Sequence, residues 1–267
     1  MSDDAALDVA GLSDTGTSRD HNEDACGVFH ERRDCALAAV ADGVSSGAAG
    51  ELASQMAVEI LLREFREQGP GVPAGQRLYR AVQQANIEIY DRAVAVPELR
   101  GMSTTLTAAV VEDGALTAVH VGDSRLYLLR GGALTQLTKD HTLAAEKARY
   151  GLMSKERART HADRCVLTRS VGRELIVSRD RLTQPLAPGD ALLLCSDGLH
   201  GVLDDAELAR LLAEGNAGAV CRALVAAANE RGTPDNLSAA VVRILDVPAG
   251  RAAPGGLGAA MRRILGR

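Results

Sequence analysis

The chain has 267 residues, of which 46% are hydrophobic, and its 30 Lys and Arg against 35 Asp and Glu give a formal net charge of −5. This acidic balance argues against a nucleic-acid surface, which relies on clustered basic side chains, and the length allows one large core. The five cysteines include no C-x-x-C pair, the N-terminus is acidic, and no apolar stretch approaches the roughly 18 residues of a membrane span. These features predict a cytoplasmic protein without an integral membrane segment.

The first half of the chain is predicted to form strands and then two amphipathic helices. Small and β-branched residues alternate in the expected strands, and apolar residues recur at helical spacing in the expected helices. The strands are 7–13, 25–29 and 36–41, and the helical patterns run over 50–66 and 78–89 on either side of a Gly/Pro-rich linker at 69–75.

The second half is predicted to be strand-rich, with its helices near the end. Turn residues separate four closely spaced strands, which predict an antiparallel meander of 104–111, 115–121, 126–130 and 133–137. Further strands are expected at 192–195 and 237–244, and helices at 204–212 and 217–229. Residues 142–164, here called the flap, are polar and either cover a site or form a plain surface connection. Segregated strands and helices argue against a Rossmann-like fold.

Acidic motifs stand where several of these strands end. They are Asn22-Glu23-Asp24, Asp42-Gly43, Ser196-Asp197-Gly198 and Asp235-Asn236. Strand ends hold side chains rigidly, and a glycine after an aspartate lets the chain turn sharply. One Asp-Gly pair alone would more often be a turn, but the combination predicts a single site with oxygen ligands for Mg²⁺ or Mn²⁺.

With these motifs the chain resembles the metal-dependent type 2C Ser/Thr protein phosphatases in their bacterial form, over roughly residues 8–245. Each segment is a weak signal, whereas eight in the family's order are specific. The segments are Ser18–Asp24, Ala41–Gly43, Met102–Thr105, Gly122–Arg125, Leu137–His141, Leu167–Gly172, Ser196–Leu199 and Asp235–Asn236.

The resemblance implies an α+β fold, a four-layer α-β-β-α sandwich of two antiparallel sheets flanked by helices. We expect the catalytic domain to span residues 1–246. Residues 247–267 would be a Pro/Gly linker and a short basic tail. A fraying tail is the favoured interpretation, and contact with an anionic membrane or a partner is the alternative.

The resemblance also implies a centre of two Mn²⁺ or Mg²⁺ ions. Asp42 is expected to bridge both ions with the Gly43 carbonyl on one, Asp197 and Asp235 on the other, and Glu23 or Asp24 completing the shell. Asp123 matches the residue that holds a third, weaker ion in relatives, although a hairpin-turn aspartate is an equal alternative.

Arg19 matches the arginine that binds the phosphate in relatives, since a guanidinium can contact two phosphoryl oxygens at once. His141 could be a ligand or an acid, but a lone histidine at a strand end is more often a structural hydrogen-bond partner.

The function implied is hydrolysis of phosphoserine and phosphothreonine in proteins by direct attack of a metal-bridging hydroxide. We expect phosphorylated proteins as substrates, a bacterial Ser/Thr kinase that the protein opposes, and a monomer. A cysteine-dependent phosphatase is disfavoured, because the chain lacks a C-x₅-R loop and Cys195 lies in an apolar strand.

One segment departs from the family. Residues Val44-Ser45-Ser46-Gly47 replace the Met-Gly-Gly-His of many bacterial members, and animal members have a histidine where Val44 stands. This altered loop leaves one alternative to an active phosphatase, a sensory module that keeps the fold but scarcely turns over. A second alternative is a hydrolase of another phosphoester, because nothing in the sequence specifies the group that bears the phosphate.

Overall fold

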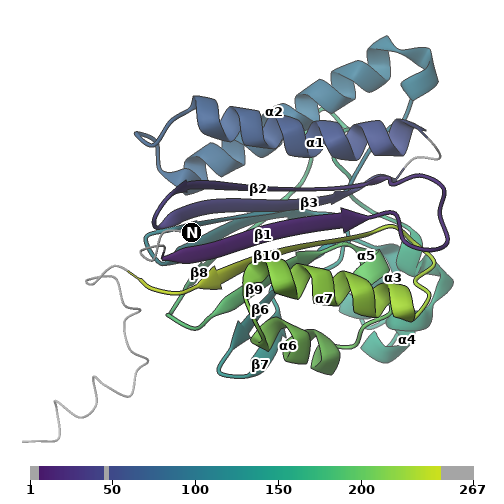
Figure 1. The fold of residues 1–267 in the computed structure, drawn as a ribbon. Coiled ribbons are helices and arrows are strands. Elements are labelled where there is room, and N and C mark those ends of the chain that lie inside the picture. The colour runs from purple at the N-terminus through teal and green to yellow at the C-terminus, as the bar shows by residue number, and fades with distance from the viewer. Residues whose placement is uncertain (1–5, 45–47, 248–267) are drawn as a thin grey trace, which may run out of the picture.

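The computed structural model describes residues 6–44 and 48–247. In this part of the chain ten strands form two five-stranded antiparallel sheets that pack face to face, with helices on both outer surfaces (Figure 1). The predicted α+β sandwich is confirmed. The altered segment at 45–47 and the expected tail at 248–267 lie outside the described residues.

Each sheet combines strands that are distant in the sequence. The first sheet has the order β1 (Leu7–Asp14), β10 (Leu237–Ile244), β9 (Ala191–Cys195), β6 (Arg125–Arg130) and β7 (Ala133–Gln136). The second has the order β2 (Asp24–Arg32), β3 (Cys35–Asp42), β4 (Leu106–Glu112), β5 (Ala115–Val121) and β8 (Asp180–Pro185).

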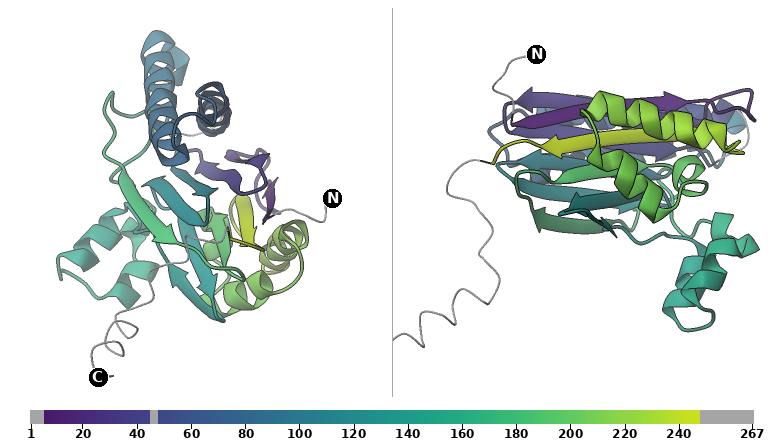
Figure 2. Two further views of the ribbon diagram at one scale, coloured as in Figure 1. Left: turned by 90° about the vertical axis from the view of Figure 1, so that its left-hand side faces the viewer. Right: turned by 60° about the horizontal axis from the view of Figure 1, so that its bottom comes forward.

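The helices fall into four groups. The second sheet is covered by α1 (Ala48–Glu67) and α2 (Ala74–Ala95), and the first by α6 (Asp205–Ala213) and α7 (Ala217–Glu230). Short helices are η1 (Pro97–Leu99) after α2 and α5 (Asp197–His200) after β9. The flap contains α3 (Leu143–Arg149), α4 (Lys155–Thr160) and η2 (Ala162–Cys165), and α3 and α4 stand away from the sandwich (Figure 2).

Because the fold has four layers, the central strands are unbroken runs of apolar residues. In β3, Leu37 and Ala39 pack under α1 and α2, while Ala38 and Val40 pack against the other sheet. All four side chains are fully buried. A strand covered on both faces must be apolar at consecutive positions, because its side chains alternate between two cores.

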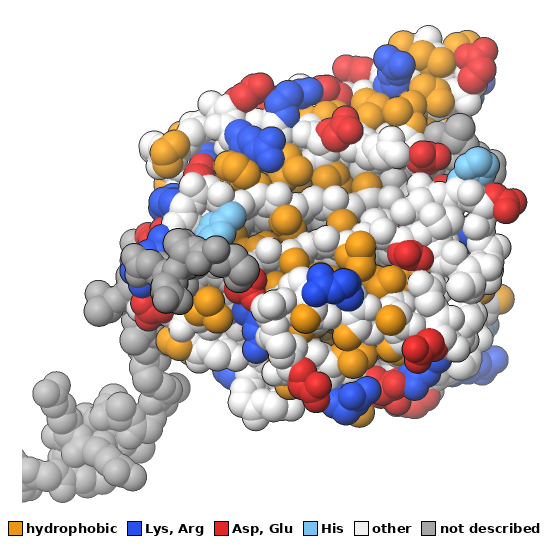
Figure 3. Space-filling view, viewed as in Figure 1, with side chains coloured by type: hydrophobic (Ala, Val, Ile, Leu, Met, Phe, Trp, Pro, Cys, Tyr) orange, Lys and Arg blue, Asp and Glu red, His pale blue; other side chains and the backbone are white. Residues whose placement is uncertain are grey.

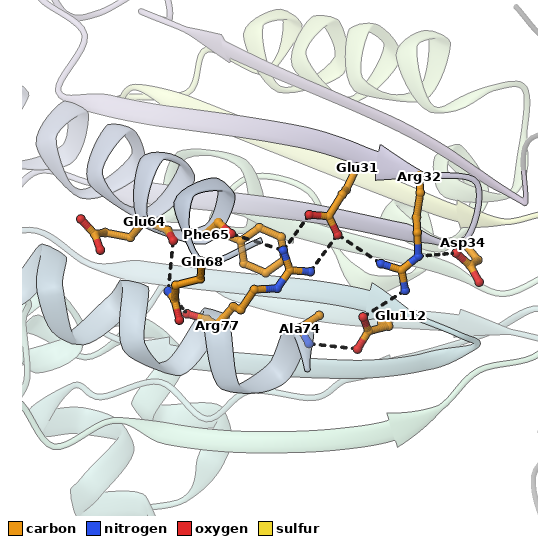
Figure 4. A network of polar contacts seen from close by, with 9 residues as sticks. All are labelled: Glu31, Arg32, Asp34, Glu64, Phe65, Gln68, Ala74, Arg77 and Glu112. Atoms are coloured by element: carbon orange, nitrogen blue, oxygen red, sulfur yellow. Dashed lines mark hydrogen bonds and ion pairs between the residues drawn. The ribbon is translucent and has the colours of Figure 1, made fainter. Parts of the chain in front are cut away.

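A buried ion pair joins α2 to the second sheet. The Arg77 side chain is 0% exposed and donates to the two carboxylate oxygens of Glu31 at 2.6 and 2.7 Å, and its guanidinium lies 4.0 Å from the centre of the Phe65 ring (Figure 4). These hydrogen bonds lower the pKa of Glu31. Removing either partner would leave a poorly solvated charge, so the pair holds the helix in one position.

The predicted meander of four strands is wrong. The β4–β5 hairpin lies in the second sheet and the β6–β7 hairpin in the first, and the chain crosses between them at Gly122–Ser124. Gly122 has φ of +108° and allows this turn, which residues with a side chain rarely adopt. Hairpin patterns report local pairing only, so they could not assign the second hairpin to the other sheet.

Strand β8 was not predicted. It pairs with β5 at the edge of the second sheet, and its residues alternate between half-buried and exposed. An edge strand with one solvated face carries few apolar residues and therefore a weak signal. Helix α2 also begins at Ala74, inside the predicted linker.

Acidic and basic side chains are interspersed over the face that carries α1, β1 and α7 (Figure 3). Among the described residues no helix is long and apolar enough to cross a membrane.

Candidate metal centre

The acidic motifs of both sheets meet at one end of the sandwich. Asp24 begins β2 and pairs directly with Asp42 at the end of β3. In the other sheet Asp197 follows β9 and Asp235 precedes β10, and these two strands are antiparallel neighbours. Asp123 lies between β5 and β6. Antiparallel pairing thus brings strand ends and strand beginnings together, at the right-hand end in Figure 1.

The backbone around Asp42 is held by two neighbouring threonines. Its N–H donates to Thr105 Oγ1 at 2.9 Å, and its carbonyl accepts from the Thr105 N–H and from Thr104 Oγ1, both at 2.8 Å. Burial, followed by the charges of Asp24 and Asp197, raises the pKa of Asp42 well above its usual value. Gly43 donates to the Glu23 carbonyl at 3.0 Å, which fixes the turn after Asp42.

Asp24 joins the two sheets through a serine. The Ser196 hydroxyl donates to Asp24 Oδ2 at 2.6 Å, while Ser196 Oγ accepts from the Ser238 N–H at 2.9 Å. Burial raises the pKa of Asp24 to about 7, with a further contribution from the charges of Asp197 and Asp235. A carboxyl group with this pKa is stabilised in its charged form by a nearby cation.

Asp197 carries the clearest sign of a bound group. Its Oδ1 is buried and accepts no hydrogen bond from the described residues. The pKa of Asp197 is raised by burial and then by the charge of Asp235, and the carboxyl group is within hydrogen-bond reach of Asp42. Buried oxygens without partners are rare and costly, so this atom points to a ligand that is not part of the chain.

Asp123 lies beside this cluster. Its side chain is buried, and burial and the charge of Asp197 raise its pKa. Its carbonyl contacts His200 Nε2 at 3.1 Å. The pKa of His200 is lowered to about 3 by burial, so the ring is neutral and its Nε2–H donates to this carbonyl.

Arg19 lies at the exposed rim. Its NH2 group is 2.9 Å from the Asp235 carboxylate, and its Nε–H donates to the Pro234 carbonyl at 3.1 Å. The two side chains are 47% and 37% exposed, so this ion pair is open to exchange with another anion.

Glu23 and Asn236 shape the loop between β1 and β2. The Glu23 N–H donates to Asn236 Oδ1 at 2.9 Å, and Asn236 Nδ2 donates to the carbonyls of Thr15 and His21 at 2.8 Å. Asn236 therefore positions the loop by its amide group.

Gly198 allows a close approach of two backbones. A Cβ at this position would lie 1.9 Å from the Asn236 carbonyl oxygen, far inside van der Waals contact. The sequence suggested a sharp turn as the reason for this glycine, but the packing of α5 against β10 is the actual reason.

His141 is a structural partner, as the sequence favoured. The ring Nδ1 of His141 accepts from the Gly122 N–H at 3.1 Å, and the backbone N–H of His141 donates to the Gly122 carbonyl at 2.7 Å. The ring Nε2 lies 3.4 Å from Asp180. Arg169 donates to the same Asp180 carboxylate at 2.9 Å. His141 thus connects the turn before Asp123 to the segment that follows the flap.

A groove of ≈ 1540 Å³ runs between the acidic cluster and the flap. Asp123, Asp197 and Asp235 line one part of it, and Arg149, Lys155, Arg159 and Arg164 line the flap side. The flap therefore lines the same groove as the acidic cluster, which favours a cover over a site above a plain surface connection.

Comparison with known proteins identifies the family. The family model described as protein phosphatase 2C matches residues 16–245. The chain belongs to the protein phosphatase 2C family. The serine/threonine phosphatase stp of Listeria monocytogenes is 36% identical over 234 residues, which cover 86% of this chain and 93% of that protein.

Solved structures of protein phosphatase 2C enzymes share the fold. The Mycobacterium tuberculosis serine/threonine phosphatase PstP/Ppp superposes with a TM-score of 0.81 at 34% identity, covering 90% of this chain and 99% of that structure. The PstP catalytic domain in complex with two manganese ions has a TM-score of 0.79 at the same identity and coverage. The resemblance seen in the sequence is confirmed, and the protein is a metal-dependent Ser/Thr protein phosphatase.

The donor set of this protein phosphatase 2C chain suits a hard divalent cation. Burial, and then the charges of neighbouring carboxylates, raise the pKa values of Asp24, Asp42 and Asp197. Asp197 Oδ1 has no hydrogen-bond partner in the described part of the chain. Within residues 6–44 and 48–247, no three Asp, Glu, His or Cys side chains lie in an arrangement that would hold an ion as they stand. Asp235 pairs with Arg19 instead. These residues thus fit a divalent cation by their oxygen donors and their negative charge.

Sequence reasoning missed three supporting residues of the protein phosphatase 2C site. Ser196 and Thr105 belong to quoted motifs, but their hydrogen bonds to Asp24 and Asp42 could not be derived from the motifs. Arg164 was not considered, although the basic composition of the flap is a signal that could have found it.

Proposed function

We propose that the protein hydrolyses phosphoserine and phosphothreonine residues of proteins with two bound Mn²⁺ or Mg²⁺ ions. Asp42 would hold both ions, with the Gly43 carbonyl, Asp197 and Asp235 as further ligands. Glu23 or Asp24 would complete the shell, and Asp123 with Asp197 would hold a third, weaker ion. The observation that carries the proposal is the buried Asp197 Oδ1, which has no hydrogen-bond partner among the described residues and lies among carboxyl groups whose pKa values are raised.

When bound, divalent ions lower the pKa of water toward neutrality and offset the charge of the phosphoryl group. The chain itself supplies burial, orientation and a cation. Hydrogen bonds from Thr104 and Thr105 to the Asp42 backbone hold the carboxylate in place. Ser196 does the same for Asp24 by donating to its Oδ2. A rigid donor set avoids reorganisation during the reaction.

Arg19 would bind the phosphoryl oxygens of the substrate. Its guanidinium is half-exposed at the rim, beside Asp235, so an incoming phosphoryl group can reach it. Bidentate hydrogen bonds from a guanidinium fix the orientation of a phosphoryl group as well as its position.

A direct displacement by water, without a phosphoenzyme, agrees with the state of Cys195 and Cys26, each of which lies two residues from an aspartate of the acidic motifs. Burial raises the pKa of Cys195 to about 12 and that of Cys26 to about 11. Thiols with such pKa values are protonated at neutral pH and are poor nucleophiles.

The cellular setting is also a proposal. Substrates that carry phosphoserine or phosphothreonine require a Ser/Thr kinase that makes them, and we propose that the protein opposes such a kinase as a monomer. Gel filtration with light scattering tests the oligomeric state, because the measured molar mass of a dimer would be twice that of a monomer.

The first test is phosphate release from a phosphothreonine peptide in Mn²⁺ or EDTA. We expect Asp42→Asn to lower kcat/KM by about 10²-fold or more, because charge-stabilising groups of this kind contribute on that scale. Manganese binding, measured by calorimetry, should weaken in the same variant. The matched control is Asp91→Asn, an exposed residue on α2.

Turnover that survives EDTA or the Asp42→Asn change would contradict the proposal. A protein that binds Mn²⁺ but releases no phosphate would favour the sensory module. Faster release from a small phosphoester than from any phosphopeptide would favour a hydrolase of another phosphoester.

A further inference from the structure

The flap is a basic segment of an acidic protein. Its residues 142–164 include six Lys and Arg and three Asp and Glu, whereas the whole chain has a net charge of −5. Such local charge asymmetry is a surface property that steers and selects charged partners, and it has no direct effect on the fold.

Four of the six basic residues of the flap line the groove, together with one acidic residue, Glu146. Lys155 and Arg159 lie one helical turn apart on α4, and both line the groove. Arg157 lies between them in the sequence and does not line it. Residues four apart share one face of a helix, and the residue midway between them points away. Arg149 and Arg164 extend the same wall.

Ion pairs within the protein do not neutralise the positive charges of this wall. Lys147 of the flap pairs with Asp163. Among the described residues, however, Lys155 and Arg164 form no ion pair within 4.0 Å, and Arg159 reaches Asp205 only at 4.0 Å. Arg149, Lys155, Arg159 and Arg164 are all exposed. Their charges are therefore available to a bound molecule.

The wall reaches the acidic cluster at one end. Arg164 of the flap and Asp197 of the acidic cluster both line this groove. A substrate whose phosphoryl group lies at Asp197 would thus have its flanking residues beside the flap. The groove volume of ≈ 1540 Å³ exceeds the range of about 300–1,000 Å³ typical of small-molecule pockets, so it has room for a peptide segment.

We propose that the basic wall, formed by Arg149, Lys155, Arg159 and Arg164, binds acidic side chains that flank the phosphorylated residue of the substrate. This inference rests on the proposed phosphatase activity and specifies its substrates. The protein prefers phosphopeptides with neighbouring Asp or Glu, because these complement the flap.

The experiment compares two phosphothreonine peptides that differ only in whether the flanking residues are Asp and Glu or Asn and Gln. We expect the protein to show a higher kcat/KM for the acidic peptide. In a Lys155→Gln/Arg159→Gln double variant this preference should fall by about 3- to 10-fold, the scale of two exposed ion pairs. The fall should appear in KM, and added salt should reduce the preference of the unaltered protein.

Arg157→Gln is the matched control, since it removes a charge from the same helix without altering the wall. The inference is overturned if the two peptides are hydrolysed equally, or if Arg157→Gln reduces the preference as much as the double variant does. Equal hydrolysis leaves the phosphatase proposal intact. Failure to hydrolyse either peptide with Mn²⁺ bound would overturn both.

Discussion

Ser196 shows how one small side chain can connect two sheets. It follows β9 in the first sheet, donates to Asp24 at the start of β2 in the second, and accepts from Ser238 in β10. A hydroxyl group is suited to this position because it donates and accepts at the same time. The orientation of a proposed ligand, Asp24, therefore depends on a residue that would not touch an ion.

At the same scale, the close packing at Gly198 predicts that a larger residue at this position would destabilise the protein. Gly198→Ala should destabilise the protein by several degrees in Tm and weaken Mn²⁺ binding, because the new Cβ would overlap the Asn236 carbonyl. Thermal unfolding and calorimetry measure the two effects.

Gly71→Ala is the comparison, since a Cβ at Gly71 meets nothing within 4 Å. That change should leave Tm nearly unaltered or raise it slightly. Equal stability of the two variants would show that α5 and β10 can separate without cost.

At the scale of elements, the connection from β5 to β6 links the flap to the candidate centre. Gly122 is bonded to His141 in both directions, and the Thr168 N–H, just after the flap, donates to the His141 carbonyl at 2.8 Å. Because Gly122 precedes Asp123, a shift at the base of the flap can reach Asp123 through this connection.

Two substitutions distinguish the roles of the two ring nitrogens of His141. In His141→Asn the amide oxygen occupies the place of Nδ1 and can still accept from Gly122, whereas His141→Gln reaches only the place of Nε2. We expect the Gly122 amide to keep its protection from hydrogen exchange in the asparagine variant. In the glutamine variant it should exchange about 10-fold faster or more, since a buried donor loses its partner. The same exchange rate in both variants would contradict this role of the ring.

At the scale of the whole molecule, folding brings like charges together. Carboxyl groups from both sheets meet at one end, and those of Asp24, Asp42, Asp123 and Asp197 have raised pKa values. A raised pKa in the folded state means that stability is present at low pH and is lost as pH rises through that pKa.

Most of the stability that Asp24 contributes is lost between its ordinary pKa of 3.8 and about pH 7. The protein treated with EDTA should lose the remainder between about pH 6.5 and 8, by roughly 2 °C in Tm. Asp24, with a pKa of about 7, ionises in this window. The buried histidines have lowered pKa values and act in the opposite direction, but only below their ordinary pKa of about 6.5. Mn²⁺ should remove most of the loss.

Asp24→Asn tests the assignment, because an amide cannot ionise. The slope of Tm against pH without Mn²⁺ should be shallower in this variant. An unchanged slope would mean that other groups dominate the pH dependence.

Much of the fold could be predicted because its elements are encoded locally. The apolar runs of β3, β9 and β10 and the helical spacing in α1 and α7 agree with the predictions within a few residues. The sequence could not assign the β4–β5 and β6–β7 hairpins to different sheets, since that choice depends on contacts between distant segments. The edge strand β8 was missed for lack of apolar residues.

By itself, the sequence determined the family and the acidic residues at the strand ends, because motif order and side-chain periodicity are properties of the chain. The sandwich followed from the resemblance to the family. Only the tertiary structure decided that Ser196 would orient Asp24 and that the basic wall of the flap would face the acidic cluster. It also decided that Asp197 Oδ1 has no hydrogen-bond partner within residues 6–44 and 48–247. These features depend on contacts between residues that are far apart in the chain, and local sequence patterns do not specify such contacts.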